Sequence, residues 1–427
     1  MVSDRPIKRL QVSEDTSGLT LDLRDTLAEL AALPPAIAGD PAQASQYLTA
    51  YLDWRPMGSD PGRRPARRQF ADAAEAALAA YAPHSPAAAS LAVDIERVTR
   101  YLDGERVDRN LDIPPLPAAA QGVALVARSA ADVFVPIPLA TPPATALATG
   151  PIPALMPLAR LADDLATYAV LLADQQEATL VFVTQARDAR STVAYGANYP
   201  FKRKAGGSQR RYQARAVAEG VREALDESGV EVLVIAGDEV ITSPLDRLLH
   251  QSVADRTIGT LRLDIATPMP QIVEATLPID EAAERGREAK AAADVRAAVS
   301  AGGLGAAGAA AVLRALQNVQ VETLVMVDDF TAPGWADYAA GIAGVGDIPD
   351  EHPTGGARGQ IVPIRVEDEI IRRAVATGAN IEIVHSREPG PDAASAIPDT
   401  NEAPPRTDAA RLLDDIGVGA LLRFRSE

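Results

Sequence analysis

The alternation of apolar and polar positions along the first 155 residues predicts a segment of mixed helices and strands. Residues 47–53 alternate with a period of two, which is typical of a strand. Residues 122–127 and 132–139 indicate a strand pair joined by a short turn, and the Pro- and Ala-rich stretch 136–157 favours edge strands. Helical spacing of apolar residues predicts helices over 21–33, 69–81 and 87–102, with a basic loop over 55–68 before the second helix.

Between residues 156 and 280 the pattern changes to antiparallel strands followed by alternating helices and strands. The apolar runs 168–173 and 179–184 indicate a hairpin, and 191–195 fits a third strand. Ala214, Val217, Val221 and Leu225 form the apolar stripe of an amphipathic helix, which Gly229 ends. The run 232–236 is apolar throughout, as expected for a strand buried on both faces, and a helix over 244–251 and a strand over 258–263 follow. This order resembles an RNase H-like α/β fold.

The remaining residues, 281–427, predict a compact α/β/α domain. Helices are expected over 281–300, 309–316 and 367–377, and strands over 323–327, 361–366, 381–384 and 420–424. Residues 302–308 form a Gly- and Ala-rich hinge, and the Pro- and Gly-rich stretches 329–359 and 387–407 are expected to be mobile loops. The whole chain is therefore predicted to be an α/β protein of three domains, 1–155, 156–280 and 281–427.

Charge singles out one short region of the second domain. The formal net charge of the protein is −17, yet residues 189–218 contain no Asp or Glu, where the average density of acidic residues would place about 4. The same stretch contains seven basic residues: Arg190, Lys202, Arg203, Lys204, Arg210, Arg211 and Arg215. A basic segment in an acidic protein is suited to enter a polyanionic site.

The centre of this basic segment carries the candidate chemistry. Gly206 and Gly207 allow the backbone to approach a ligand closely. Ser208 and Gln209 follow, and the Gln209 amide could orient a water molecule while its backbone N–H faces a developing oxyanion. The alternative interpretation is an exposed loop between a hairpin and a helix, whose arginines are only solvated. The sequence leaves both interpretations open.

Other kinds of site find less support. The four histidines, His84, His250, His352 and His385, are far apart and lack metal-ligand spacing, and the chain has no cysteine. A two-metal nuclease needs converging carboxylates. The candidates near strand ends are Asp188, Asp238, Glu239, Asp246 and Asp264. Because the first two strands of this segment contain no carboxylate, ordinary solvation of strand ends explains these residues better, and we expect no metal and no other cofactor.

The N-terminal segment contains a further group of basic residues, and the chain lacks membrane signals. Arg63, Arg64, Arg67 and Arg68 are compatible with a second RNA contact and equally with a solvated helix start. Residues 302–308 match a dinucleotide fingerprint only superficially, since they follow a helix rather than a strand. No signal-peptide core and no run long enough to cross a bilayer occurs, so a soluble cytoplasmic protein without membrane contact is expected.

The loop Lys204-Ala-Gly-Gly-Ser-Gln-Arg-Arg-Tyr212 and the domain order resemble bacterial and archaeal relatives of the eukaryotic class-one translation release factor. The chain looks closest to the Vms/Ankzf-type peptidyl-tRNA hydrolases. Release factors carry Gly-Gly-Gln at this tip, and the hydrolases carry Gly-x-x-Gln, which Gly206 and Gln209 match; Ser208 is an insertion relative to the former. Residues 311–325 and 367–384 are similar to parts of the ribosomal-protein-like C-terminal domain of release factors. The resemblance covers residues 160–427.

The resemblance implies an enzyme that frees nascent chains from stalled ribosomes. Its partners would be the large ribosomal subunit and peptidyl-tRNA, with a further translation factor as an open question. The implied catalytic tip comprises Gly206, Gly207, Ser208 and Gln209. The implied RNA contacts are Lys202, Arg203, Lys204, Arg210, Arg211 and Arg215. The first segment has no recognisable stop-codon-reading motif, and the zinc finger and ankyrin repeats of the eukaryotic hydrolases are absent.

Three alternatives to ester hydrolysis remain open at the level of sequence. The protein could cut a phosphodiester bond near the tRNA 3′ end, which the resemblance to the hydrolases also implies. It could be a non-catalytic ribosome- or RNA-binding surveillance factor. The least favoured alternative is a metal-dependent RNase H-like nuclease.

Overall fold

The computed structural model describes residues 23–37, 45–57, 64–105, 107, 113–165, 167–174, 177–184, 193–200, 207–237, 251–388 and 404–425. Their contacts fall into two compact units. Leu165–Arg285 form the central unit, and Gly18–Asp164 together with Gly286–Glu427 form the terminal unit. Within the described ranges, no helix is long and apolar enough to cross a membrane. The division of the chain into three domains at about residues 155 and 280 stays a prediction.

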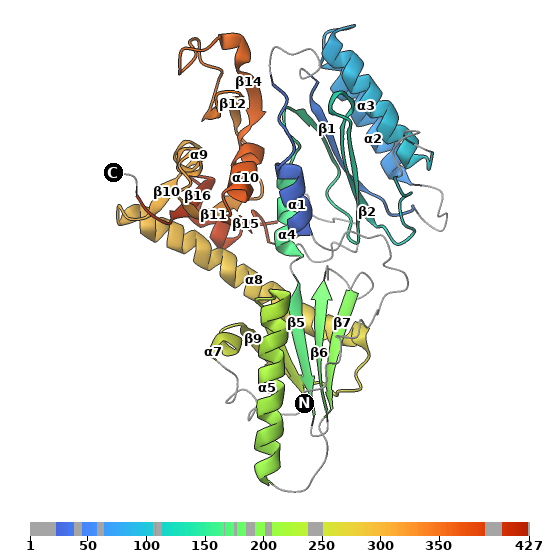
Figure 1. The fold of residues 1–427 in the computed structure, drawn as a ribbon, viewed down its shortest axis with the longest axis vertical. Helices are drawn as coiled ribbons and strands as arrows, with labels where there is room; N and C mark the ends of the chain where they lie inside the picture. The colour runs from blue at the N-terminus through green and yellow to red at the C-terminus, as the bar shows by residue number, and fades with distance from the viewer. Residues whose placement is uncertain are drawn as a thin grey trace. The chain divides into compact units, whose positions relative to one another are not determined.

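The central unit is built on a five-stranded sheet with the order β7-β6-β5-β8-β9 (Figure 1). The strands are β5 (Tyr168–Ala173), β6 (Glu177–Thr184), β7 (Val193–Pro200), β8 (Leu233–Gly237) and β9 (Thr257–Leu261). β5, β6 and β7 pair antiparallel, whereas β8 lies parallel to both β5 and β9. The expected hairpin and third strand are confirmed. β8 is buried along its whole length, as its continuous apolar sequence predicted.

Helices cover both faces of this sheet. α5 (Gly207–Ser228) and α7 (Gln251–Ala254) contribute to the apolar core on one face, where Val217, Val221 and Leu225 are buried. On the other face, the start of α8 (Met269–Ser300) buries Ile272 and Val273. The prediction that this long helix begins at residue 281 is wrong by twelve residues. Ile272, Val273 and Thr276 face the sheet, and tertiary burial of this kind outweighs the poor helical signal of Pro278.

The terminal unit contains an antiparallel sheet of order β3-β2-β1-β4. Its strands are β1 (Tyr47–Asp53), β2 (Gly122–Arg128), β3 (Val133–Leu139) and β4 (Ala146–Gly150). The accompanying helices are α1 (Leu23–Ala31), α2 (Pro65–Ala79), α3 (Pro86–Leu102), the 3-10 turn η1 (Ser129–Ala131) and α4 (Met156–Asp164). α2 begins four residues before the predicted start, because Pro65 suits the first turn of a helix, where its missing N–H is not needed.

The same unit contains a second sheet of order β10-β16-β11-β15. Its strands are β10 (Gly305–Ala307), β11 (Val321–Val327), β15 (Asn380–Val384) and β16 (Val418–Leu422), and the helices are α9 (Ala309–Gln317), α10 (Val366–Ala376) and α11 (Asp408–Leu412). The helices and strands predicted for this region are present with shifts of one to a few residues. The hinge predicted over 302–308 is partly wrong, because β10 lies inside it and pairs with β16.

The region 329–359, predicted to be a mobile loop, instead contributes to a small sheet of order β13-β12-β14. Its elements are β12 (Pro333–Asp337), β13 (Ile342–Val345), the 3-10 turn η2 (Arg358–Gln360) and β14 (Val362–Arg365). A side chain at Gly344 would collide with the Trp335 ring, so this glycine makes room for close packing rather than for mobility. Short strands rich in Gly and Pro give almost no period-two pattern, which is why the sequence did not reveal β12 and β13.

Candidate functional site

α5 supports the candidate tip. Its second half packs on the central sheet through Val217, Val221, Ala224 and Leu225. A helix of 22 residues is about 33 Å long, whereas the longest strand of the sheet, with 8 residues, spans about 27 Å. Figure 1 shows the beginning of α5 extending past the end of the sheet. The sheet therefore holds α5 by its second half and leaves its first turns outside the core of the central unit.

The structure changes the local prediction at the tip. The helix begins at Gly207, seven residues before the predicted Ala214, so part of the expected loop forms the first turns of α5. Gln, Arg and Ala dominate this stretch and favour the helical state. The candidate residues within α5 are Gly207, Ser208, Gln209, Arg210, Arg211 and Arg215. Lys202, Arg203, Lys204 and Gly206 lie outside the described residues, so the role of the tip stays a prediction.

Charge is distributed unevenly along α5. Its first turn contains no acidic residue, so the positive end of the helix dipole coincides with the basic sequence. Further along, the charges neutralise one another: Arg222 contacts Glu219 at 2.6 Å and Asp226 at 2.9 Å. Arg256, which precedes β9, adds a 3.0 Å contact to the same Asp226. In the sequence of α5, basic residues without acidic neighbours thus lie toward its beginning, where backbone N–H groups also favour an anion.

Of the carboxylates considered for a nuclease, only Asp264 belongs to the described part of the chain. Asp188, Asp238, Glu239 and Asp246 lie outside the described part of the chain. Asp264 follows β9, and its carboxylate accepts a hydrogen bond from the Ala266 N–H at 2.8 Å, so it stabilises a turn. β5 contains no carboxylate. The interpretation of Asp264 as an ordinary residue at a strand end agrees with its contacts.

Two histidines of the terminal unit have partners that the sequence did not indicate. His352 Nε2 lies 2.9 Å from Asp337 Oδ2, and its Nδ1 accepts the Gly356 N–H at 3.0 Å. His385 Nδ1 lies 2.6 Å from Glu288, and its Nε2 lies 3.3 Å from Asp164. These two carboxylates raise the pKa of His385 to about 10. Of the other histidines, His84 is exposed, and His250 lies outside the described residues.

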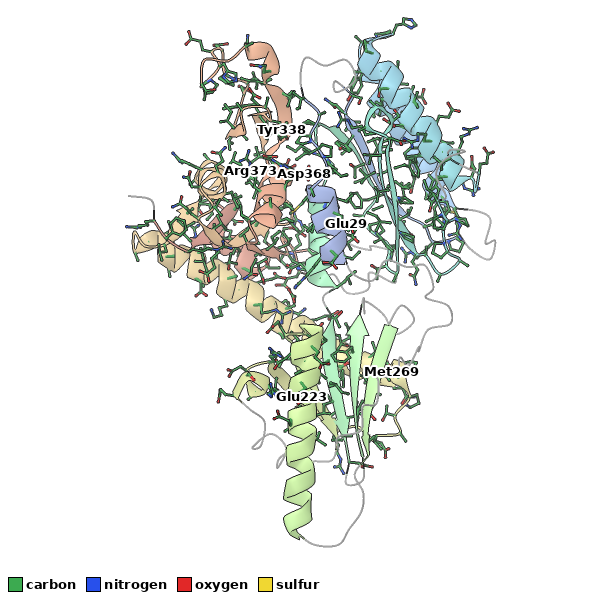
Figure 2. The ribbon with its side chains drawn as sticks, in the orientation of Figure 1. Glu29, Glu223, Met269, Tyr338, Asp368 and Arg373 are labelled. Carbon is green, nitrogen blue, oxygen red and sulfur yellow. The ribbon has the colours of Figure 1, made fainter. Side chains whose placement is uncertain are left out.

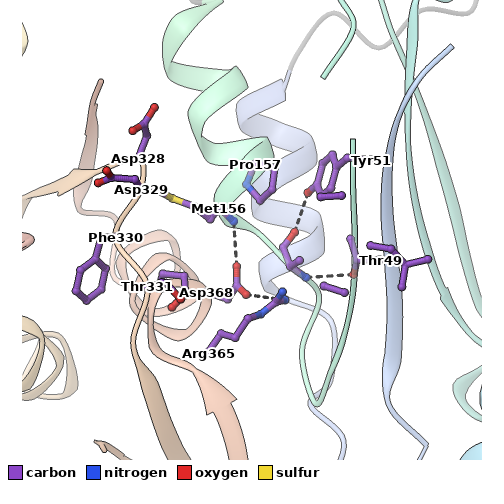
Figure 3. Close-up of a pocket in the computed structure, with 15 residues that line it drawn as sticks. Thr49, Tyr51, Met156, Pro157, Asp328, Asp329, Phe330, Thr331, Arg365 and Asp368 are labelled. Atoms are coloured by element: carbon purple, nitrogen blue, oxygen red, sulfur yellow. Dashed lines mark hydrogen bonds and ion pairs between the residues drawn. The ribbon is translucent and has the colours of Figure 1, made fainter. Parts of the chain in front are cut away.

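The beginning of α10 inserts three consecutive acidic residues into the terminal unit, and each has its own partner. Glu367 accepts the Ala332 N–H at 3.2 Å, and Glu369 contacts Arg372 and Arg373 at 2.8 and 2.5 Å. Figure 2 labels Asp368 and Arg373 of this helix. Asp368 accepts the N–H groups of Leu155 and Met156, at the start of α4, at 2.7 and 3.0 Å (Figure 3). It also pairs with Arg365 at 2.7 Å.

A cavity of about 250 Å³ lies beside Asp368 within the terminal unit (Figure 3). Two further acidic residues that line it are held by basic side chains, since Asp328 contacts Arg160 at 2.7 Å and Asp329 contacts Arg406 at 2.7 Å. The far end of α4 is anchored by Asp163, which accepts the Ile383 N–H at 2.7 Å; burial and the nearby Glu382 raise the pKa of Asp163 to about 8. These contacts therefore have a structural role: they hold both ends of α4 against the second sheet and α10 of the terminal unit.

The basic residues at the start of α2 also have partners inside the protein. The guanidinium groups of Arg64 and Arg67 lie 4.7 and 5.7 Å from the centre of the Trp54 ring. Arg67 donates to the Leu102 carbonyl at 3.1 Å, and Arg68 lies 3.6 Å from Asp72. Arg63 lies outside the described residues. These contacts favour the interpretation of a helix start over that of a second RNA contact.

Comparison with known proteins identifies the class to which the central region is related. Residues 153–285 match the model of bacterial archaeo-eukaryotic release factor family 10. This segment contains β5 to β9, α5 and the whole basic stretch. The expected resemblance to the release-factor group is thereby confirmed for this segment, while particular closeness to the Vms/Ankzf-type hydrolases stays a prediction. No curated protein matches the chain.

Solved structures of translation termination factors and of Pelota and Dom34 proteins are only weakly similar to this chain. A chain from a model of ribosome-bound archaeal Pelota and ABCE1 has 12% identity and a TM-score of 0.40, with 99% of this chain and 100% of that chain covered. Dom34 of S. cerevisiae has 8% identity and a TM-score of 0.36, covering 68% and 74%. The archaeal translation termination factor aRF1 has 13% identity and a TM-score of 0.23, covering 94% and 97%. At TM-scores this low, a shared fold does not follow, and the family match over residues 153–285 is what supports the relationship to release factors.

Proposed function

We propose that this protein is a release-factor-like peptidyl-tRNA hydrolase, which frees nascent chains held on ribosomes in the cytoplasm. The observation that carries the proposal is that three features occur in the same segment of the chain. The part of the chain that matches the release-factor family contains the acid-free basic stretch 189–218, and Gln209 belongs to the first turn of α5. The strand order β7-β6-β5-β8-β9, three antiparallel strands followed by two parallel ones, supports an RNase H-like central domain.

The tip would enter the peptidyl-transferase region of the large subunit. Lys202, Arg203, Lys204, Arg210, Arg211 and Arg215 would contact RNA phosphates, which position a protein without reading sequence. The Gln209 amide would hold a water molecule against the ester carbonyl of peptidyl-tRNA, and Gly206, Gly207 and Ser208 would set its reach. This reaction requires only that Gln209 position a neutral water molecule, and the ribosomal RNA would form the rest of the catalytic site.

The test is single-turnover release of a labelled nascent chain from stalled large-subunit complexes. Gln209→Ala should lower the release rate by about 100-fold, the size of effect found when one catalytic hydrogen-bonding group is removed. Gln213→Ala is the matched control, since it removes the same amide one turn further along the same helix. Equal release by the wild type and Gln209→Ala would show that the catalytic assignment is wrong. An equal loss in both variants would also argue against a specific role for residue 209.

Analysis of the released tRNA distinguishes the two bonds. Ester hydrolysis leaves the tRNA 3′ end intact, so that the tRNA accepts an amino acid again without repair. A tRNA shortened at its 3′ end, together with a peptide that still carries the removed 3′ nucleotides, would instead identify cleavage of a phosphodiester. Cleavage of free RNA that a chelator abolishes would support the metal-dependent nuclease over both.

Binding separates the enzyme from a non-catalytic surveillance factor. Arg210→Glu with Arg211→Glu should weaken ribosome binding strongly and reduce its salt dependence, because each lost phosphate contact removes counterion release. Arg262→Glu, an exposed position of the same unit, is the control for a general change in charge. If these changes abolish binding while no turnover is found with the wild type, the protein is a binding factor.

A further inference from the structure

A valine at the end of α9 adopts a backbone conformation that is normally left to glycine. Val319 has a φ of +56° and occupies the position directly after the helix cap. Its N–H donates to the Leu316 carbonyl at 3.0 Å, and the Gln320 N–H donates to the Ala315 carbonyl at 2.9 Å, which together form a Schellman motif. A β-branched side chain is strained in this left-handed region, where glycine is free of strain.

Packing does not explain this valine. Its side chain is 49% exposed, so it adds little to the core, whereas Val312 in the same helix is fully buried. The position therefore combines a left-handed backbone with an apolar side chain facing solvent; the helix cap accounts for the backbone conformation but not for the choice of valine. Strained residues that persist without a structural benefit are a signal of function.

Two more exposed apolar side chains belong to segments that are hydrogen-bonded near the end of α9. The Gln320 side-chain amide donates to the Phe424 carbonyl at 3.2 Å, and the Arg423 N–H donates to the Gln320 carbonyl at 2.7 Å, so the chain after β16 lies against the end of α9. The Leu422 N–H donates to the Leu304 carbonyl. Leu304, Val319 and Phe424 are exposed by 43%, 49% and 51%. Figure 1 shows α9, β10 and β16 together beside the C-terminus.

Three arginines and one exposed acidic residue, Glu322, belong to the same segments. The Arg423 guanidinium donates to the Gly378 carbonyl at 2.8 Å, and that of Arg425 donates to the Gly303 carbonyl at 2.6 Å. Backbone carbonyls fix both guanidinium groups in place without neutralising them, and among the described residues neither forms an ion pair. Arg314, exposed in the last turn of α9, adds a third positive charge. This local charge is opposite to the net charge of −17 of the whole protein.

We propose that Leu304, Val319 and Phe424 form an apolar docking surface for an acidic amphipathic segment of a partner protein. The apolar side of such a segment would cover the three side chains, and its carboxylates would face Arg423 and Arg425. A nucleic acid would use the charges but leave the apolar centre exposed, so the observations favour a protein partner. The surface belongs to the terminal unit and is independent of the chemistry proposed for Gln209.

The test begins with a display library of random peptides, each of about 16 residues, selected on the immobilised full chain. Selected peptides should be rich in Asp and Glu with apolar residues at helical spacing. Their affinity should fall by about tenfold or more for Phe424→Ser and for Val319→Gly. Val93→Ser is the control, because Val93 is a similarly exposed valine, at 47%, on α3.

Val319→Gly separates docking from folding. A valine that served only the fold would destabilise the protein when removed, whereas relief of strain here should raise Tm by about 2 °C while binding is lost. The proposal is overturned if the library yields no peptide that depends on Val319 and Phe424, or if the selected peptides are basic. It is equally overturned if only oligouridine RNA, and no peptide, shows the dependence on Phe424.

Discussion

Replacing Asp368 tests how much its hydrogen bonds to the start of α4 contribute to the stability of the terminal unit. This buried carboxylate accepts the N–H groups of Leu155 and Met156 and pairs with Arg365. Alanine leaves two buried donors without an acceptor, and each costs about 1–3 kcal/mol, so we expect Asp368→Ala to lower the free energy of unfolding by about 3 kcal/mol. Asparagine keeps an acceptor oxygen for both donors, and Arg365 is exposed enough to turn toward water, so Asp368→Asn should change the stability by about 1 kcal/mol or less at pH 7.

The pH dependence of the same variants gives a second, signed test. Burial raises the pKa of Asp368 from 3.8 to about 6 in the folded protein. Because the folded state then binds the proton more tightly than the unfolded state, this group's contribution to stability is fully present below pH 3.8 and is lost as the pH rises through 6. The shift corresponds to about 3 kcal/mol, so the stability of the wild type relative to Asp368→Asn should rise by up to that amount between pH 7 and pH 4.

Urea unfolding followed by tryptophan fluorescence is the appropriate assay. The only two tryptophans, Trp54 and Trp335, both belong to the terminal unit, so their emission reports that unit alone. Asp350→Ala is the control, since the Asp350 side chain is fully exposed and should contribute within about 0.5 kcal/mol. If the Ala and Asn variants of Asp368 are destabilised equally, the role of this residue as an acceptor for backbone donors is refuted. A pH trend of opposite sign would refute the burial argument.

Two further predictions concern stability. His385→Leu should lower the free energy of unfolding by about 3 kcal/mol at pH 7, because it removes the imidazolium that pairs with both Asp164 and Glu288. Since the pKa of His385 is raised from 6.5 to about 10, its contribution is fully present below pH 6.5 and disappears as the pH rises through 10; a wild-type profile that stays parallel to the variant would contradict this. In the central unit, Gly237→Ala should lower the free energy of unfolding by about 2 kcal/mol or more, because the new Cβ would overlap a carbonyl oxygen of β5. At Gly229 a Cβ would meet no atom, so Gly229→Ala should lower it by only about 1 kcal/mol. Thermal unfolding followed by circular dichroism measures both effects.

The residues behind these predictions show where sequence reasoning succeeded and where it failed. The strand 47–53 was predicted with its observed limits, and the stripe of Val217, Val221 and Leu225 correctly indicated the buried face of α5. The partners of Asp368 lie 213 and 212 residues away, and no local pattern connects positions so far apart. The same reason hid the contacts of His385 with Asp164 and Glu288. The strands β12 and β13 were missed because their Gly and Pro residues resemble those of a loop, whereas β14 was predicted as a strand over 361–366.

The candidate site was likewise predicted correctly in some respects and wrongly in others. The sequence alone revealed the acid-free basic stretch, the Gly206 and Gln209 pattern and the resemblance that the family match then supported for residues 153–285. It placed the start of the helix too late, because Gly-Gly-Ser predicts a turn while the Gln-, Arg- and Ala-rich residues that follow extend α5 back to Gly207.

Local composition and periodicity determined which segments bury an apolar face and where positive charge gathers, since both properties depend on neighbouring residues. Tertiary structure determined which partner each buried charge meets and which apolar side chains remain exposed. Glu367, Asp368 and Glu369 are consecutive and nearly identical in chemistry, yet each meets a different partner because helical geometry turns their side chains in different directions. Val319 likewise looks ordinary in the sequence, and only its left-handed backbone and its exposure beside Phe424 mark it as a candidate for binding.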